Sequence, residues 1–199
     1  MCGICGELRV DGGPHDGGTL GPMLAKLERR GPDHEGRWVR GAVALGHRRL
    51  SVIDLSDASN QPWVDEALGL ALVFNGAIYN YKELRAELKQ QGYGFVSDGD
   101  TEVVLKAYAA WGEDFVRRLH GMFAFAIWDQ RRRRLVLARD RFVVETRLGE
   151  VLAAAAATVG QDDRLAVRRL ELQGQVPGEG VGHVDDHVHV EHGLVVRHV

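Results

Sequence analysis

The chain has 199 residues and a formal charge of −3, which excludes a protein that binds nucleic acid mainly through an overall positive field. Its hydrophobic share of 45% is typical of a folded domain and excludes a chain that is disordered throughout. No apolar run approaches the roughly 20 residues of a membrane helix, and Glu7 and Arg9 do not fit a signal peptide. Two cysteines are too few for a disulfide framework, so we expect a cytoplasmic protein without a membrane partner.

Composition changes at about Arg141. Residues 142–199 contain 13 Val and 5 His but no Ile, Trp, Tyr, Ser or Asn. Ordinary cores use aromatic residues and Ile, and ordinary loops use Ser and Asn. We therefore treat 1–141 as one domain and 142–199 as an atypical tail, within which Ala-rich 151–159 favours a helix.

The first 141 residues alternate between short apolar runs and segments with helical spacing. In chain order they predict a strand at 4–10, a helix from Thr19 (as N-cap) to Arg30, strands at 42–45, 50–53 and 70–74, helical segments at 81–90, 101–111 and 115–119, and a hairpin of strands at 122–128 and 135–138. Thr101 is the expected N-cap of its helix. Several strands with separate helices predict a layered α+β domain.

Position 2 offers the sharpest chemical feature. Removal of Met1 would leave Cys2 with a free α-amino group beside its thiol. A thiolate is a strong nucleophile, and an α-amine titrates close enough to neutral pH to act as its base. This pairing predicts an N-terminal nucleophile, while the alternative is an inert cysteine.

Cys2 and Cys5 also form a C-x-x-C motif, which is typical of redox or zinc sites. His187 and His189 of the tail could complete a Cys2His2 set with these two cysteines, and together with His183 and His192 they could form a metal-binding tail. Because Cys5 lies in an apolar strand, it is more simply a small core residue. We therefore expect no metal site in this chain.

Three further features admit both a catalytic and an ordinary reading. Asn75 and Gly76 follow an apolar strand and could donate two N–H groups to an oxyanion, or form a tight turn. Arg49 could bind a carboxylate in bidentate fashion or lie solvated on the surface. Asp100 could bind an ammonium group or favour a helix N-terminus.

These features occur together in seven ordered motifs. They are residues 1–6 (MCGICG), 30–33 (RGPD), 47–54 (HRRLSVID), 74–80 (FNGAIYN), 99–102 (GDTE), 121–128 (GMFAFAIW) and 139–141 (RDR). The set resembles the glutaminase domain of class II glutamine amidotransferases of the asparagine synthetase family. Within that family, 55–57 (LSD) and 110–113 (AWGE) are most similar to the N-acetylglutaminylglutamine amidotransferase branch.

The resemblance implies an N-terminal-nucleophile hydrolase fold, in which two stacked antiparallel sheets lie between helical layers. It implies that Cys2 attacks the side-chain amide of L-glutamine, that Asn75 and Gly76 form the oxyanion hole, and that ammonia and glutamate are released. Other positions match residues that bind glutamine: Arg49 at its α-carboxylate, Asp100 at its α-ammonium, and Leu50, Ser51, Val52, Ile53 and Ala77 around the pocket. The segment 30–33 matches a loop near the glutamine site.

The sequence departs from the family pattern in two places. Ala77 stands where many relatives have an acidic residue, and 142–145 (FVVE) replaces the family's next strand, so we expect a sheet that is incomplete at its C-terminal end. The family's ATP-binding synthetase domain is absent from these residues, so we expect no ATP or Mg²⁺ here, with a second copy or a separate synthetase domain as the protein partner.

Three accounts of the tail stay open: a changed reading frame in a GC-rich gene, a divergent natural C-terminus, and a metal-binding tail. Two alternatives to glutamine hydrolysis also stay open. One is a catalytically inactive fragment, and the other is a metal-binding module built from Cys2, Cys5 and the tail histidines.

Overall fold

The computed structural model describes residues 2–9, 11–140 and 166–171. The strands are β1 (Gly3–Leu8), β2 (His34–Arg40), β3 (Val43–Arg49), β4 (Trp63–Asp65), β5 (Leu70–Ile78), β6 (Gly121–Asp129), β7 (Arg134–Arg139) and β8 (Ala166–Glu171). The helices are α1 (Leu20–Leu27), α2 (Tyr81–Gln90) and α3 (Asp100–Trp111), with 3₁₀ turns at Asp57–Ser59 and Gly112–Arg118. No helix among the described residues is long and apolar enough to cross a membrane.

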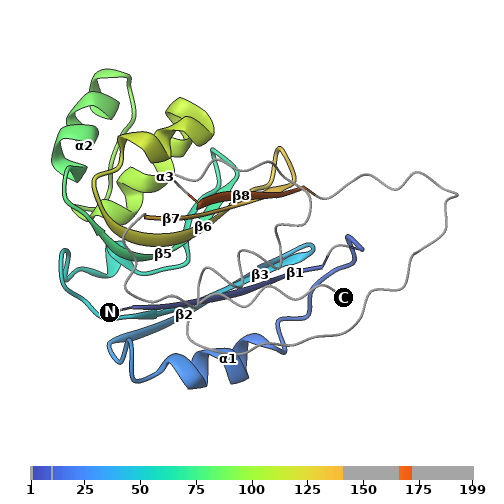
Figure 1. Cartoon of the computed structure of the whole chain (residues 1–199). Coiled ribbons are helices and arrows are strands. Elements are labelled where there is room, and N and C mark those ends of the chain that lie inside the picture. The colour runs from blue at the N-terminus through green and yellow to red at the C-terminus, as the bar shows by residue number, and fades with distance from the viewer. Residues whose placement is uncertain (1, 10, 141–165, 172–199) are drawn as a thin grey trace, which may run out of the picture.

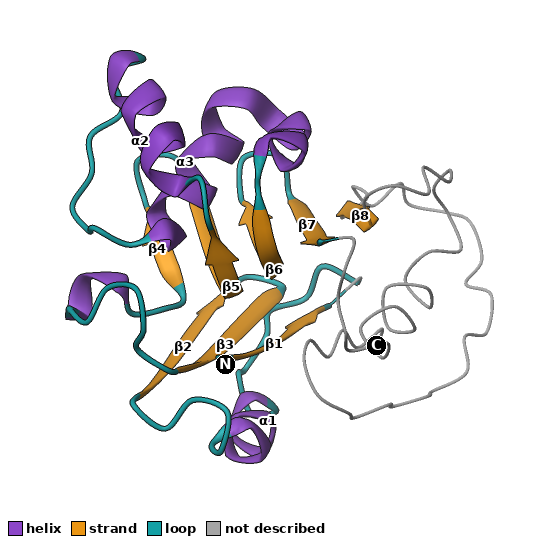
Figure 2. Ribbon diagram, turned by 60° about the vertical axis from the view of Figure 1, so that its left-hand side comes forward, coloured by secondary structure: helices purple, strands orange, loops and turns teal. Residues whose placement is uncertain are grey.

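The strands form two antiparallel sheets, which lie one above the other (Figure 1). The first sheet has the order β1-β3-β2, and the second has the order β4-β5-β6-β7-β8. Helix α1 covers the outer face of the first sheet, and α2 with α3 covers the outer face of the second (Figure 2). The predicted α+β architecture, with two sheets between helical layers, is therefore confirmed.

Three groups of buried side chains hold these layers together. Leu20, Leu24 and Leu27 of α1 pack with Cys5 and Ala44 on the first sheet. Successive residues of a strand point to opposite faces, so the neighbours of Cys5 point toward the second sheet. That middle layer is filled by Ile4, Leu8, Val43, Leu45, Val73, Ala126, Trp128 and Leu137, among others. The third and largest group joins the other face of the second sheet to α2 and α3.

The structure corrects several expected boundaries. Helix α1 ends at Leu27 rather than Arg30. Thr19 occupies the expected N-cap position but makes no capping bond with its side chain, because its hydroxyl donates to the Glu7 carboxylate at 2.5 Å. Gly99, not Thr101, precedes α3. The helical segment expected at 115–119 is a 3₁₀ turn that begins at Gly112.

The strand predicted at 50–53 is wrong, because β3 ends at Arg49. The Leu50 N–H instead contacts the Cys2 sulfur, and the Ser51 N–H donates to the Asp33 carboxylate at 2.8 Å. Strands β2, β4 and β8 were not predicted. Strand β2 has a mostly half-buried polar sequence, β4 has three residues, and β8 lies beyond the composition change at Arg141. The helix expected at 151–159 lies outside the described residues.

Strand β8 pairs with β7 along its whole length, from Ala166 opposite Arg139 to Glu171 opposite Arg134. The described part of the second sheet therefore continues past β7, where the sequence alone led us to expect an incomplete sheet.

Candidate active site

Cys2 lies directly before β1 and next to the end of β3. The Leu50 N–H points to the Cys2 Sγ at 3.3 Å, and the Arg30 Nε donates to the Cys2 carbonyl oxygen at 3.3 Å. Cys2 lies two residues before Ile4 and so is on the same face of the strand, and the Ile4 side chain lies in the layer between the two sheets. The half-buried thiol is thus held near that layer.

Cys5 is more deeply buried than Cys2 and lies on the other face of β1. Its side chain is 1% exposed and packs against α1 on the opposite face of β1. Burial, with a smaller contribution from Glu35, raises the pKa of the Cys5 thiol to about 12. Cys5 therefore stays protonated near neutral pH, and the two cysteines do not act as a pair.

Among the described residues, no group of three or more His, Cys, Asp or Glu side chains could hold a metal ion. The histidines that the metal-binding alternative requires, His183, His187, His189 and His192, lie outside the described residues.

Segment 30–33 lies beside Cys2 and the end of β3. Gly31 packs on the backbone of β3, where a Cβ atom would come within 2.3 Å of the Arg48 carbonyl carbon. The Asp33 N–H donates to the Arg49 carbonyl oxygen at 3.0 Å. Together with the contacts of Arg30 and Ser51, these bonds fix the path of the chain around the thiol.

Arg49 is buried at the end of β3 and is held by the loop that follows. Its guanidinium donates to the Ser56 carbonyl oxygen at 2.8 Å, to the Asn60 side-chain oxygen at 2.6 Å and to the Asp54 carbonyl oxygen. These contacts use three of the five N–H groups of an arginine. The guanidinium is therefore oriented by the protein itself, which sequence reasoning did not anticipate.

Asp54 is a residue that sequence reasoning included in a motif without giving it a role. Its carboxylate accepts bonds from the Ser59 hydroxyl at 2.6 Å, the Ser56 N–H at 2.8 Å and the Asp98 N–H at 3.1 Å. These donors, the Ser59 hydroxyl first, hold the pKa of Asp54 well below its usual range. The loop 54–60, which holds Arg49, is thereby connected to the segment that leads into Asp100.

Asp100 is the first residue of α3 and is buried. Its Oδ2 accepts the backbone N–H of Ile78, at the end of β5, at 2.9 Å. Burial raises the pKa of this carboxyl group against the opposing effect of its backbone donors. Asp100 thus sits at the edge of the strand that carries Asn75 and Gly76.

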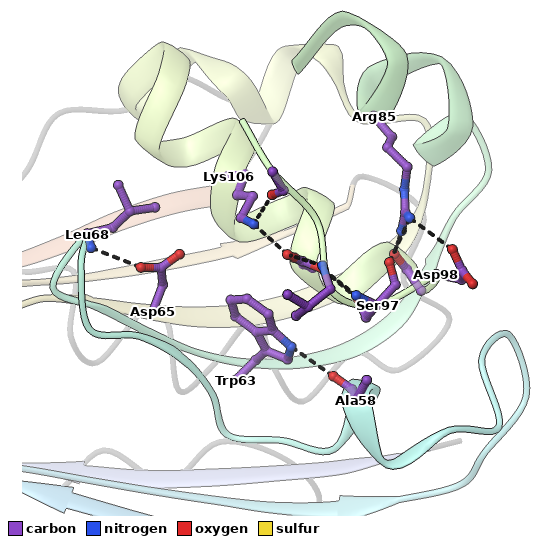
Figure 3. A network of polar contacts seen from close by, with 12 residues as sticks. Ala58, Trp63, Asp65, Leu68, Arg85, Ser97, Asp98 and Lys106 are labelled. Atoms are coloured by element: carbon purple, nitrogen blue, oxygen red, sulfur yellow. Dashed lines mark hydrogen bonds and ion pairs between the residues drawn. The ribbon is translucent and has the colours of Figure 1, made fainter. Parts of the chain in front are cut away.

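A buried polar network fixes the segment before Asp100 (Figure 3). The Glu102 carboxylate accepts the Ser97 N–H at 2.8 Å and pairs with Lys106. Arg85 donates to the Ser97 carbonyl oxygen at 2.7 Å and to the Gly99 carbonyl oxygen at 2.6 Å. The approach to Asp100 is therefore set by side chains of α2 and α3.

Asn75 and Gly76 lie inside β5 rather than in a turn, so the tight-turn reading is wrong. Asn75 lies on the same face of β5 as Val73, whose side chain lies between the two sheets. Both Asn75 and Cys2 therefore face that layer. Strand β4 pairs only with residues as far as Leu72, so one edge of β5 is open beyond that point.

The open edge of β5 has one unusual N–H group. In an antiparallel strand every second residue directs its N–H to the same edge. The Phe74 N–H donates to Gln61 at 2.6 Å and the Ile78 N–H to Asp100. Gly76 lies between them, and no described residue accepts its N–H. This donor is available to a ligand next to the Asn75 amide.

The remaining expected pocket residues lie around these groups without forming one enclosed wall. Leu50 and Ser51 are half-buried beside Cys2 and segment 30–33, and Ala77 is half-buried on β5. Val52 and Ile53 are 72% and 41% exposed. No hydrogen bond joins Arg49 directly to Asp100 among the described residues; Asp54 connects the two elements.

An antiparallel two-sheet domain between helical layers, with a half-buried cysteine directly before its first strand, is the arrangement that the sequence motifs led us to expect. Residues 1–146 match the family described as the glutamine amidotransferase domain. The chain belongs to this family, as the sequence motifs predicted.

Named relatives agree with this assignment. The chain is 39% identical over 148 residues to asparagine synthetase [glutamine-hydrolyzing] 3 of Bacillus subtilis, a match covering 73% of this chain and 24% of that protein. It is 39% identical over 158 residues to amidase chry2 of Gibberella zeae, covering 73% and 23%. The chain thus spans about a quarter of the length of these relatives.

One solved structure, a glutamine phosphoribosylpyrophosphate amidotransferase from Bacillus subtilis, is 27% identical with a TM-score of 0.43, over 51% of this chain and 24% of that chain.

Proposed function

We propose that this chain hydrolyses the side-chain amide of L-glutamine, with Cys2 as N-terminal nucleophile. The observation that carries the proposal is the pairing of two features across the layer between the sheets. A half-buried cysteine thiol directly precedes the first sheet, and the Asn75 amide lies on the second sheet with the Gly76 N–H, which no described residue accepts. Membership of the glutamine amidotransferase family gives this pairing its substrate.

The proposed reaction proceeds through a thioester. The Cys2 sulfur attacks the amide carbon, and its proton passes to the α-amino group that removal of Met1 exposes. The Asn75 amide and the Gly76 N–H donate to the oxyanion of the tetrahedral intermediate. Collapse of that intermediate breaks the carbon–nitrogen bond, and the α-amino group returns the proton to the departing ammonia. Water then cleaves the thioester to release glutamate.

Two charged side chains are proposed to select glutamine over other amides. The Asp100 carboxylate, at the edge of β5, binds the α-ammonium group. The Arg49 guanidinium, which keeps two N–H groups beyond its three contacts to the Asp54–Asn60 loop, binds the α-carboxylate. Leu50 to Ile53 and Ala77 are proposed to contact the aliphatic part of the substrate.

We further propose that the ammonia is used by a synthetase part or partner, because the B. subtilis relative is named as a glutamine-hydrolysing asparagine synthetase and the match covers only 24% of its length. The N-acetylglutaminylglutamine branch, suggested by 55–57 and 110–113, is the narrower form of this proposal. ATP and Mg²⁺ would bind to the synthetase part. A cytoplasmic location stays a prediction from the cysteine content.

The test is glutamate release from glutamine by the parent chain, Cys2→Ala and Cys5→Ala, with intact mass confirming removal of Met1. We expect turnover in the parent and in Cys5→Ala, and none in Cys2→Ala. Cys5 is the matched control because burial keeps its thiol protonated. A folded parent without turnover, or equal turnover in Cys2→Ala, would refute the proposal and favour an inactive fragment.

A further inference from the structure

Two buried side chains hold the backbone of β5 on its open edge, one residue before Asn75. Gln61 accepts the Phe74 N–H through its Oε1 at 2.6 Å, and the His47 Nε2 lies 3.2 Å from the Phe74 carbonyl oxygen. Gln61 is 5% exposed and His47 is fully buried. Both polar groups of Phe74 on this edge are thus bound by side chains at the place where β4 no longer pairs with β5.

The His47 contact also joins the two sheets directly. His47 belongs to β3, where it pairs with Ile4 of β1, and Ile4 lies two residues after Cys2. Phe74 belongs to β5, directly before Asn75. One hydrogen bond therefore connects the strand pair that carries the thiol to the strand that carries the oxyanion donors.

The protonation state of His47 follows from its surroundings. Burial lowers the pKa of His47 to about 3, and the neighbouring His34 and Arg49 act in the same direction. The ring is therefore neutral near pH 7. Because a carbonyl oxygen can only accept, the single ring proton lies on Nε2 and is donated to Phe74. The Nδ1 atom has no hydrogen-bond partner among the described residues.

We propose that His47 and Gln61 are positioning residues for the oxyanion site, an inference that rests on the proposed glutaminase function. Gln61 fixes the peptide plane before Phe74, and His47 fixes the plane after it, which carries the Asn75 nitrogen. The next peptide plane carries the Gly76 N–H. The two side chains replace the missing β4 ladder and so hold this N–H at the distance from Cys2 that the oxyanion requires.

Positioning of the oxyanion donors is expected to affect the transition state rather than the binding of substrate. The oxyanion exists only after Cys2 has attacked, so misplaced donors slow the chemical step without weakening the binding of glutamine by Asp100 and Arg49. Misplacement of a catalytic group by about 1 Å can cost about a hundredfold in rate. The expected signature is therefore a lower kcat with an almost unchanged KM.

The experiment measures kcat and KM for glutamine hydrolysis in the parent, His47→Leu, His47→Gln, Gln61→Met and Thr101→Val. We expect kcat to fall about tenfold to a hundredfold in His47→Leu and Gln61→Met, with KM within about twofold. His47→Gln keeps an N–H donor and should recover most of kcat. Thr101→Val removes the other hydrogen bond of Gln61, to the Thr101 hydroxyl at 3.3 Å, and should leave kcat near the parent value.

A second readout separates positioning from general damage. Iodoacetamide alkylates Cys2 by direct displacement of iodide, a reaction that forms no oxyanion, so its rate should be the same in parent and variants. Unchanged kcat in His47→Leu and Gln61→Met would overturn the inference alone. So would a fall in kcat matched by an equal fall in alkylation. If His47→Leu does not fold, Gln61→Met and His47→Gln decide the question, whereas a parent without turnover overturns the proposed function itself.

Discussion

At the scale of single residues, the site is built from charged groups that the protein itself orients. Arg49 is held by two carbonyl oxygens and Asn60, and Asp54 accepts three donors from two loops. Burial raises the pKa of Asp100, against the opposing effect of its backbone N–H donors. No cationic side chain among the described residues pairs with this buried carboxylate, which makes it well suited to bind a substrate ammonium group.

Asp100→Asn tests this role. The amide oxygen can still accept the Ile78 N–H, but the negative charge is lost. We expect KM for glutamine to rise about tenfold to a hundredfold, the value of a charged hydrogen bond, with a smaller change in kcat. Asp98→Asn is the matched control, because its side chain is fully exposed two residues away. Equal KM values for both variants and the parent would contradict the assignment.

A second prediction at this scale concerns pH and His47. Burial lowers its pKa from 6.5 to about 3 in the folded chain. Between these values the unfolded chain binds a proton that the folded chain does not, so stability falls as pH falls below about 6.5. As the pH is lowered from 7.5 to 5, we expect the Tm of the parent to fall more than the Tm of His47→Gln. A difference that is constant with pH would show that His47 titrates alike in the folded and unfolded chain, and would contradict the lowered pKa.

At the scale of elements, the decisive feature is that β5 is paired on both edges over only part of its length. Strand β6 follows it from Leu70 to Ile78, but β4 stops opposite Leu72. The interruption gives three backbone groups to side chains of His47, Gln61 and Asp100, and leaves the Gly76 N–H exposed. A complete ladder would have consumed the donor that the proposed chemistry requires.

Gly76 is required by the backbone of β5 as well as by its open edge. Its φ angle is +150°, and a Cβ atom would lie 2.2 Å from the Met122 carbonyl oxygen of β6. Gly76→Ala must therefore push β5 and β6 apart, and we expect a loss of about 2 kcal/mol or more in the free energy of unfolding. Gly94→Ala, whose Cβ would meet nothing within 4 Å, serves as the control in the same urea titration. Equal midpoints for the two variants would refute this packing argument.

At the scale of the whole molecule, two sheets share one apolar layer and the proposed site lies at the polar end of that layer. Ile4, Leu45 and Val73 fill the layer, and Cys2, His47 and Asn75 continue the same strand faces. Packing of the sheets therefore sets the separation between Cys2 and the proposed oxyanion donors. Strand β8 contributes by pairing with the outer edge of β7, which would otherwise be unpaired.

Two shortened chains test the contribution of β8. A chain that ends after residue 146 lacks β8 and exposes the β7 edge, so we expect a lower Tm and self-association in light scattering. A chain that ends after Glu171 keeps β8 and should behave like the parent. If the shorter chain matches the parent in both measurements, β8 is dispensable and 1–141 is the complete folding unit, as the composition change suggested.

The sequence by itself determined the family, the α+β class and the residues with reactive groups, because these follow from residue types in a fixed order. It also located α2 and most core strands, whose apolar spacing is local. Only the tertiary structure decided that β3 ends at Arg49, that β4 leaves β5 open after Leu72, and that His47 reaches the Phe74 carbonyl oxygen. Each of these depends on contacts between segments distant in sequence, which local propensity and spacing do not contain.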